Sequence, residues 1–505
     1  MLSEQSFINY GNQGFTLIPL WYVFDLPNSF DTLRLYEVLA NQGQDYLFET
    51  SQRHNNTFER AFSVIGLRCH DRFELSEGYL HHYQGDELYQ KWECDDPLAE
   101  LSRLHQALRA PELGQLPPFS GGLFGYFGFE TTRLIEPRLR RQPRKPSGLT
   151  QPDAVQLLSL DLVVVDHQQG LIYCIVHGFP EECSGYQQAY ERLARLVEQL
   201  QNFLSEASNT QKVQPIRLVQ PQKLTYSFPQ NEFLHAVDRI REYIVAGDVM
   251  QVVLSQRMSQ NFQADATTLY RTLASQGDSP YRYLLNLGDS QIVGASPEML
   301  FQKRGNQVIS RPMAGTRRRG VDNREDQTLR DDLLSDPKEI AEHMMLVDLA
   351  RNDLGRVAEL GSVTVDKLLA VEHFPNVMHI VSTTECYVSP QVQAIDVLKS
   401  TFPAGTLSGA SKIRALEVIA ELEPHSRGVY GGSIGYMDLH GNADQAITIR
   451  TGVLANGQLH IQAGAGVVQD SHPEREWQET QEKSQLMLQA ACASLQRQEE
   501  PEACI

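Results

Sequence analysis

The sequence predicts an α+β fold in which helices and antiparallel strands follow one another in mixed order. Apolar residues recur at helical spacing over residues 186–203 and 231–246, whereas the apolar runs over 250–258 and 291–303 have the length of strands. The pair Asn456-Gly457 separates two apolar runs, which is typical of a tight antiparallel hairpin. A doubly wound parallel sheet is therefore not expected.

The first half of the chain contains an apolar strand pair and then a helix. Residues 156–177 read as a hairpin, and the helix over 186–203 buries Leu193, Leu196 and Leu200 on one face. A polar segment with three prolines, 205–230, lacks helical spacing, so we expect it to connect an N-terminal region (1–204) to a second region (231–490).

The second region opens and closes with a helix. The opening helix over 231–246 has an apolar stripe and stops at Gly247; the stripe consists of Phe233, Val237, Ile240 and Ile244. The closing helix runs from about Pro473 to Gln496, and residues 491–505 are expected to form a polar C-terminal tail.

Composition and charge restrict the function classes. The chain has 505 residues with 41% hydrophobic and 21% charged residues, as expected for one large composite domain or two coupled ones. Its formal net charge of −19 argues against binding nucleic acid or an anionic membrane surface. The seven cysteines form no C-x-x-C pair, and neither a signal peptide nor a membrane-spanning run is present. We expect a cytoplasmic protein.

Two glutamate pairs have the spacing of ligands on one helix face. Glu339 and Glu342 are three residues apart, as are Glu476 and Glu479. That spacing places both carboxylates of a pair on one side of a helix, and Mg²⁺ prefers carboxylate oxygens together with oxygens of its substrate. Taken alone, each pair is equally typical of a solvated helix surface.

Glycine-flanked segments offer anion sites or tight turns. Gly315 and Thr316 precede the basic run Arg317–Arg319, which clamps an anion or faces solvent, and Gly464, Ala465 and Gly466 end a strand. Arg450 at the end of AITIR suits capture of a carboxylate or is a strand-end charge. His379 lies in an apolar run where a core histidine is the simpler interpretation. Thr406 and Tyr430 lie beside glycines, which is weak evidence.

The order of nine segments resembles the chorismate-binding enzyme family. These segments are AGDVMQVVLSQR, GASPEML, RPMAGTRRRG, EHMMLVDLARNDLGRV, FPAGTLSGASKIRA, YGGSIGY, AITIRT, QAGAGVV and ETQEK. The resemblance is dense over residues 230–485 and thinner upstream, where SGGLFGYFGFE carries it. It implies packed antiparallel sheets flanked by helices, with the active site in the C-terminal part.

The resemblance also implies roles for residues in matching motifs. Glu342 and Glu479 correspond to magnesium ligands, with Glu339 and Glu476 beside them. The ring carboxylate of chorismate is expected to contact the metal and three further residues, namely Gly315, Thr316 and Lys483. The enolpyruvyl carboxylate is expected to lie against Tyr430, Arg450 and the backbone of Gly464, Ala465 and Gly466. His379 resembles the catalytic histidine used in eliminating pyruvate, and Glu298 and Thr406 are expected near the reacting ring.

Two positions distinguish the reactions of this family. Isochorismate and salicylate synthases carry a lysine where this chain has Gln251, and a neutral amide cannot activate water as that lysine does. Aminodeoxychorismate synthases carry a lysine in the position of Ala314. Both substitutions favour the anthranilate pattern, in which ammonia attacks chorismate and pyruvate leaves. The alternatives are an aminodeoxychorismate or aminodeoxyisochorismate synthase component and, among non-enzymes, a chorismate-binding regulatory pseudoenzyme.

Partners follow from the same resemblance. None of the cysteines lies in a nucleophile-elbow context, so a separate glutamine amidotransferase subunit is expected to supply ammonia. The tryptophan-inhibitor pocket of the family corresponds to Thr50 and to Ser279, Pro280 and Tyr281. Arg282 replaces a methionine there, and we expect its charge to weaken or alter inhibition by tryptophan.

Overall fold

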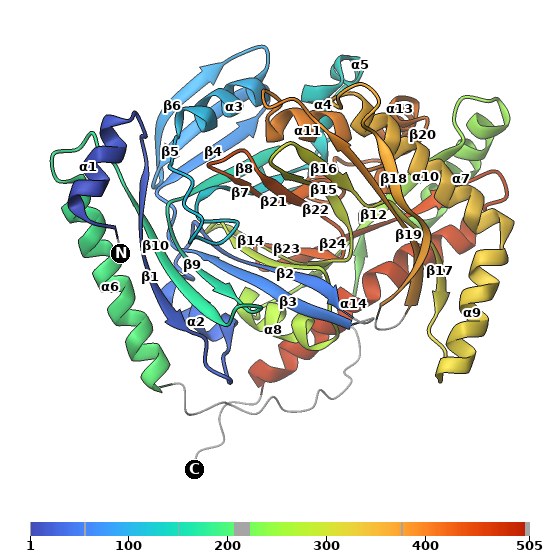
Figure 1. Cartoon of the computed structure of the whole chain (residues 1–505). Coiled ribbons are helices and arrows are strands. Elements are labelled where there is room, and N and C mark those ends of the chain that lie inside the picture. The colour runs from blue at the N-terminus through green and yellow to red at the C-terminus, as the bar shows by residue number, and fades with distance from the viewer. Residues whose placement is uncertain (1, 55–56, 150, 207–222, 375–376, 500–505) are drawn as a thin grey trace.

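The computed structural model describes residues 2–54, 57–149, 151–206, 223–374 and 377–499. Within these ranges the strands form two twelve-stranded antiparallel sheets that pack face to face, with helices outside them (Figure 1). The ring of Tyr46 in one sheet stacks on Phe124 in the other, with centroids 3.7 Å apart, inside an aromatic-rich core. The predicted α+β fold of packed antiparallel sheets is confirmed.

The first sheet combines strands from both halves of the chain. Its order is β1 (Ile18–Asp25), β10 (Leu171–Gly178), β9 (Asp161–Asp166), β3 (Thr57–Gly66), β2 (Asp45–His54), β13 (Tyr281–Asn286), β14 (Ser290–Ser296), β23 (Thr451–Ala455), β24 (Gln458–Val467), β12 (Gln251–Asn261) and β11 (Thr225–Tyr226), with β20 (Gly409–Ala410) paired to β12. The two halves meet at β2 and β13, where Thr50 lies opposite Tyr281.

The second sheet also combines strands from both halves of the chain. Its order is β17 (Met313–Arg318), β19 (Val377–Tyr387), β16 (Gln307–Ser310), β15 (Met299–Arg304), β22 (Ala443–Ile447), β21 (Ser433–Asp438), β7 (Gly122–Phe127), β8 (Ala154–Ser159), β4 (Asp71–Ser76), β5 (Tyr79–Gln84) and β6 (Glu87–Glu93), with β18 (Thr364–His373) paired to β19. Regions 1–204 and 231–490 therefore share both sheets, and the boundary between them divides the sequence rather than the fold.

Helices bury the outer faces of the sheets. The first sheet is covered by α1 (Glu4–Asn12), α2 (Thr32–Leu39), α6 (Gly185–Glu206), α8 (Ala266–Ser275) and α14 (Pro473–Glu499). The second is covered by α3 (Pro97–Ala107), α11 (Ala394–Thr401) and the end of α10 (Pro337–Gly355). Helices α7 (Gln230–Val245) and α13 (Lys412–Leu422) pack on β12 of the first sheet, and α13 also contacts β20. Helix α9 (Asn323–Ser335) packs on β17 of the second sheet. The short helices α4 (Thr132–Ile135), α5 (Pro137–Arg140) and α12 (Gly405–Ser408) lie in connections.

Elements with a strong local pattern form where the sequence predicts them. The helices expected over 186–203 and 231–246 are α6 and α7, and the apolar stripes of both face the core. The hairpin at Asn456-Gly457 joins β23 to β24, and both turn residues have positive φ angles of 51° and 71°.

The C-terminal boundary is a correction. Helix α14 continues to Glu499, and Ala491, Ala493 and Ser494 are buried against the first sheet and α8. Residues 491–499 are therefore part of the folded body rather than a polar tail, because small residues let the helix pack closely. Residues 500–505, and residues 207–222 of the predicted connector, lie outside the described ranges.

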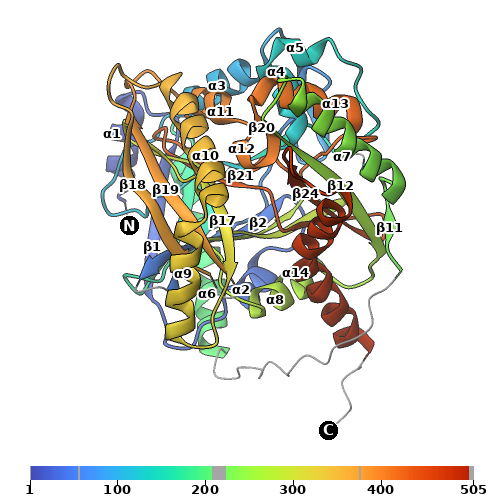
Figure 2. The ribbon, with the colours of Figure 1, turned by 90° about the vertical axis from the view of Figure 1, so that its right-hand side faces the viewer.

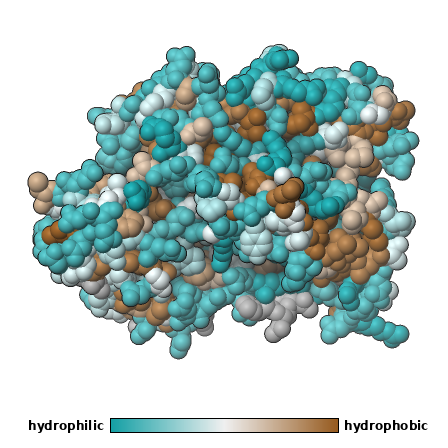
Figure 3. Space-filling view, turned by 45° about the horizontal axis from the view of Figure 1, so that its top comes forward, coloured by the Kyte–Doolittle hydropathy of each residue, from teal (hydrophilic) through white to brown (hydrophobic). Residues whose placement is uncertain are grey.

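The face of the molecule seen in Figure 3 is largely hydrophilic. Figure 3 shows hydrophilic residues over most of one face, with hydrophobic residues in separate groups between them. Among the described residues, no helix is long and apolar enough to cross a membrane.

Candidate active site

The predicted site residues come from elements that are far apart in sequence and meet at one end of the fold. Helix α10 packs on β17 and β19, and α14 packs on β24 (Figure 2). They carry Glu339 and Glu342 (α10), Glu476, Glu479 and Lys483 (α14), Gly315 and Thr316 (β17), His379 (β19), and Gly464, Ala465 and Gly466 (β24).

The two glutamate pairs lie close enough to influence one another. Burial raises the pKa of Glu342, and the negative charges of Glu339 and Glu479 raise it further. Burial also raises the pKa of Glu476, with a contribution from Glu479. The i, i+3 spacing on each helix thus produces one acidic cluster built from two helices.

Lys483 and Gln251 bind carboxylates of this cluster. The Lys483 Nζ lies 2.8 Å from Oε1 of Glu479 and donates to the carbonyl of Gly464 at 3.0 Å. Gln251 Nε2 donates to Oε1 of Glu342 at 3.1 Å. Gln251 is thus an amide directly beside the acidic cluster.

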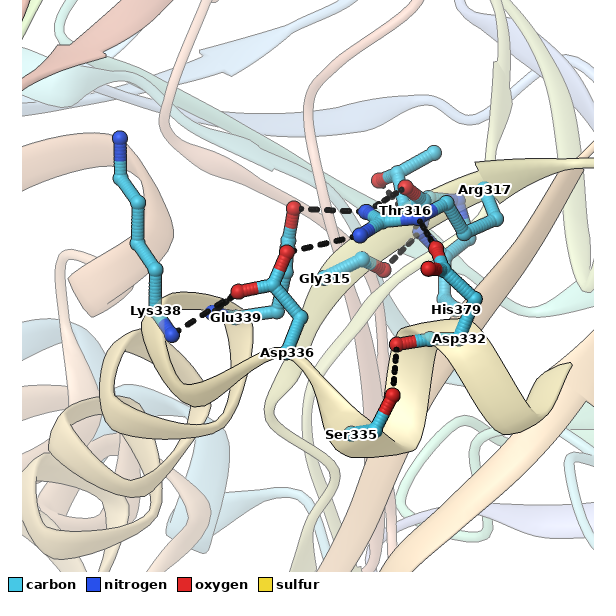
Figure 4. A network of polar contacts seen from close by, with 9 residues as sticks. All are labelled: Gly315, Thr316, Arg317, Asp332, Ser335, Asp336, Lys338, Glu339 and His379. Atoms are coloured by element: carbon cyan, nitrogen blue, oxygen red, sulfur yellow. Dashed lines mark hydrogen bonds and ion pairs between the residues drawn. The ribbon is translucent and has the colours of Figure 1, made fainter. Parts of the chain in front are cut away.

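Glu339 is bound on the outer side by Arg317 (Figure 4). The guanidinium lies 3.0 Å from Glu339, 2.7 Å from Asp336 and 2.7 Å from Asp332. Arg318 and Arg319 pair with acidic residues of α9, Glu325 and Asp326. The three arginines of the basic run therefore pair with acidic residues and link β17 to the helices beside it, while the Arg318 side chain is also exposed to solvent.

The cluster fits a magnesium ion by its donor chemistry. Within the described ranges no three His, Cys, Asp or Glu side chains are already arranged to hold a metal. Magnesium needs only one or two carboxylates because water and substrate oxygens complete its shell. Glu342 and Glu479 suit that need. Burial raises the pKa of Glu342, the charges of Glu339 and Glu479 raise it further, and a bound cation would offset both effects.

His379 is anchored at one ring nitrogen and is neutral. Its Nδ1 lies 3.1 Å from the carbonyl oxygen of Gly315 and 3.0 Å from Oγ1 of Thr316. A carbonyl only accepts, so Nδ1 carries the proton and Nε2 retains a lone pair. Burial lowers the pKa of His379 to about 4, and the charges of Arg450 and Lys483 act in the same direction. The imidazole is therefore a free base at neutral pH.

Glu298 is a buried acid of unusual pKa. It follows β14, is 6% exposed, and its Oε1 accepts a hydrogen bond of 3.0 Å from the Thr406 hydroxyl. Burial raises the pKa of Glu298 to about 8, although Thr406 and Lys483 lower it. This carboxyl is thus protonated at neutral pH and is able to donate a proton.

Glycines let the backbone approach the polar groups of the site. A Cβ at Gly464 would lie 2.9 Å from the Tyr430 hydroxyl, and one at Gly466 would lie 2.7 Å from Nε2 of Gln251. Gly315 has a φ of 71°, which disfavours a side chain there. Arg450 reaches solvent, yet the protein around it lowers its pKa by desolvation, as expected for a cation that lines a concave site.

No sequence pattern predicted the buried ion pair that lies beside Tyr430. The Arg427 guanidinium lies 5.6 Å from the Tyr430 ring centroid and 2.6 Å from Oε1 of Glu423, in a buried ion pair. The same Glu423 oxygen accepts from the backbone and hydroxyl of Ser255 at 2.8 Å each. Because Glu423 ends α13 and Arg427 lies in the loop beyond it, no periodic pattern signals the pair.

A cavity of about 300 Å³ lies between the sheets beside the site. Thr50, Pro280 and Tyr281 line it, as the resemblance predicts for an inhibitor pocket. Ser279 is buried, and its hydroxyl donates to the carbonyl of Ser296 at 2.7 Å.

Arg282 does not line this cavity. Its guanidinium lies 2.9 Å from Asp278 and 3.9 Å from the buried Glu49, which also binds Tyr270 of α8. Successive residues of a strand point to opposite faces, so Arg282 lies on the opposite side of β13 from Tyr281, which lines the cavity. The effect of Arg282 on inhibition by tryptophan stays a prediction.

Fold and site together define a class of enzyme that binds chorismate. The chain matches the family described as chorismate binding enzyme over residues 47–489, and it belongs to that family. The roles of its individual site residues remain predictions.

Similar proteins share one name. Anthranilate synthase component 1 of Pseudomonas aeruginosa is 41% identical over 498 residues, covering 98% of this chain and 99% of the relative. The protein of that name from Neisseria gonorrhoeae is 42% identical over 495 residues, covering 97% and 98%. The crystal structure of anthranilate synthase component I from Streptococcus pneumoniae has a TM-score of 0.75 at 33% identity, covering 92% of this chain and 99% of that one. MenF, the menaquinone-specific isochorismate synthase of Escherichia coli, shares the fold with a TM-score of 0.66 at 18% identity.

Proposed function

We propose that the protein is a lyase with anthranilate synthase activity, which converts chorismate and ammonia into anthranilate and pyruvate in tryptophan biosynthesis. The observation that carries this proposal is that relatives of about 40% identity, aligned over nearly the whole chain, share that name. Gln251 and Ala314, where lysines would favour the sister reactions, support the same choice.

The substrate is a dianion, and the cations of the site would orient it. Arg450 and the backbone N–H groups of 464–466 suit the enolpyruvyl carboxylate, with the Tyr430 hydroxyl beside them. Gly315, Thr316 and Lys483 suit the ring carboxylate. Glu342 and Glu479 would hold Mg²⁺, with Glu339 and Glu476 next to them, and the ion would supply positive charge to that carboxylate as electrons move into the ring.

Amination needs a proton for the departing hydroxyl group. Glu298 is protonated at neutral pH, because burial raises its pKa to about 8. It would donate that proton as the C4 hydroxyl leaves as water and ammonia forms a bond to C2. Thr406 holds the carboxyl during the transfer and stabilises the carboxylate that results.

Elimination needs a base, and His379 has the required state. Its Nε2 lone pair would take the proton from C2 of the aminated intermediate. The electrons of that bond form the aromatic ring, the C3–O bond breaks, and the enolpyruvyl group leaves as the enolate of pyruvate. The proton held by His379 then returns to the methylene carbon of that enolate and gives pyruvate, so the step balances without an oxidant.

A second subunit would supply the ammonia. The relatives are named as component 1 of their enzyme, which supports a partner component. We propose that this partner is a glutamine amidotransferase and that both act in the cytoplasm. The 300 Å³ cavity suits tryptophan as an inhibitor. Phe48, Phe119 and Tyr436 offer aromatic walls, and Arg311 and Glu372 offer opposite charges for an amino acid.

The test is an assay of the purified chain with chorismate, Mg²⁺ and an ammonium salt, followed by anthranilate fluorescence. We expect anthranilate to form without any partner subunit, because free ammonia replaces the partner's product, and we expect EDTA to abolish it. Fluorescence that persists in EDTA would overturn the metal assignment. Consumption of chorismate without anthranilate would overturn the proposed reaction.

A further inference from the structure

We propose that the β2–β3 hairpin of the N-terminal half positions the imidazole of His379, acting through Phe374. The proposal rests on the proposed function, in which His379 is the base that eliminates pyruvate. It makes Phe58, Phe374 and the ion pair between Arg53 and Glu372 positioning residues for a base more than 300 residues away from the hairpin in sequence.

An aromatic chain leads from the hairpin to the base. The ring of Phe58 in β3 lies 5.4 Å from that of Phe374, measured between centroids. Phe374 lies 5.2 Å from the His379 imidazole at an interplanar angle of 71°, an edge-to-face contact. Such contacts favour a defined ring orientation over simple apolar packing.

A charged contact runs beside the rings. Arg53 of β2 lies 3.1 Å from Glu372 of β18, and Glu372 also pairs with Arg311. In the register of β18 and β19, Glu372 lies directly opposite His379. The hairpin therefore holds both the side chain that packs on the imidazole and the strand that pairs with it.

The large cavity explains why this support is needed. Phe58, Phe374, Arg53 and Glu372 all line it, so Phe374 has open volume on one side and His379 on another. The backbone of Phe374 is fixed, because its N–H donates to Val377 at 2.7 Å and its carbonyl accepts from Arg319 at 3.1 Å. Phe374 is 8% exposed and its ring packs on both Phe58 and the His379 imidazole, so Phe58 supports the ring that contacts the base.

The consequence concerns one step of the reaction. His379 is already bound at Nδ1 by Gly315 and Thr316, so the remaining freedom is rotation of the ring about that contact. Turning the ring would move Nε2 away from the C2 proton without altering Glu298 or the acidic cluster. Loss of the support should therefore slow elimination and spare amination.

The test variant is Phe58→Leu, which leaves Phe374 and His379 intact. Single-turnover product analysis with chorismate, Mg²⁺ and ammonium separates the two steps. We expect the elimination rate constant to fall about 3- to 10-fold, so that the aminated intermediate accumulates, while the amination rate constant changes less than about twofold. Arg53→Gln should also lower the elimination rate constant more than the amination rate constant. Phe374→Tyr, which keeps an aromatic ring, should retain a higher elimination rate constant than Phe374→Leu.

The matched control is Phe203→Leu on α6, whose ring makes an edge-to-face contact with Phe30 at 5.9 Å on the other side of the molecule. A fall of both steps by one factor in Phe58→Leu, or elimination equal to that of the control, would refute the proposal.

A second readout is independent of activity. In protein labelled at histidine Cε1, the His379 signal, assigned by its loss in His379→Gln, should move in Phe58→Leu and stay in place in Phe203→Leu. An unmoved signal would refute the positioning role even if activity changed. If the native chain makes no anthranilate, the proposed function fails, and this spectrum still decides whether the hairpin positions His379.

Discussion

Replacing Thr406 by valine tests the proposed proton donor most sharply. The Thr406 hydroxyl donates to Glu298 at 3.0 Å, and that hydrogen bond favours the charged carboxylate and lowers its pKa. With the bond present, burial still raises the pKa to about 8. Without it, the carboxylate loses its nearest donor, and the pKa should rise further.

The magnitude follows from the energy of the hydrogen bond. A bond to a charged group is worth about 1.5 kcal/mol or somewhat more, and one pKa unit corresponds to about 1.4 kcal/mol. The pKa of Glu298 should therefore rise by roughly one unit in Thr406→Val. An acid that must be protonated is active below its pKa, so activity should decline above pH about 8 in the native chain and about one pH unit higher in the variant.

The assay is a pH profile of kcat at saturating free ammonia, because the fraction of ammonia that is unprotonated itself varies with pH. Ser408→Ala is the matched control: its hydroxyl is buried in the same short helix but donates to the carbonyl of Ala404. A lower plateau in Thr406→Val does not test the assignment, because only the position of the alkaline limb reports the pKa of Glu298. An alkaline limb that stays in place or moves to lower pH would refute the assignment of Glu298.

Three further substitutions test other parts of the site. Glu342→Gln should lower activity about 100-fold or more, without rescue by excess Mg²⁺. Its melting temperature should be unchanged or higher, since a carboxylate repelled by its neighbours is removed; rescue by Mg²⁺ would contradict the ligand role. Gly464→Ala should raise KM for chorismate about tenfold, because the new Cβ would lie 2.9 Å from the Tyr430 hydroxyl, and an unchanged KM would place the substrate elsewhere. Arg282→Met should leave the tryptophan concentration for half-inhibition unchanged. It should destabilise the fold by about 1 kcal/mol in thermal denaturation, because Glu49 loses one of the two arginines near it and keeps Arg60; a change in inhibition would show that Arg282 acts on the pocket.

Local sequence patterns predicted the helices and hairpins well. Helices α6 and α7 have clean apolar stripes, and the Asn456-Gly457 turn selects its own geometry, so these elements depend on neighbours in sequence. The interleaving of both halves in two sheets depends instead on pairings such as β2 with β13, which no local pattern encodes. The expectation of a polar tail from residue 491 was wrong for the same reason. The burial of Ala491 and Ala493 depends on packing partners that are distant in sequence.

The candidate site shows the same division. Motif resemblance identified Glu342, Glu479 and His379, and the fold brings their elements together. The resemblance did not show that Arg317 forms ion pairs with acidic residues of α9 and α10, or that Arg282 points away from the cavity. Both features depend on tertiary contacts. The aromatic contact between Phe58 and Phe374 joins residues without any shared motif.

The most direct test of the account is product analysis with ¹⁵N-labelled ammonium. Purified chain, chorismate and Mg²⁺ should give ¹⁵N-anthranilate and pyruvate in equal amounts, each matching the chorismate consumed. A product that carries an oxygen from water in place of ¹⁵N, or an aminated product that retains its enolpyruvyl group in the native chain, would contradict it.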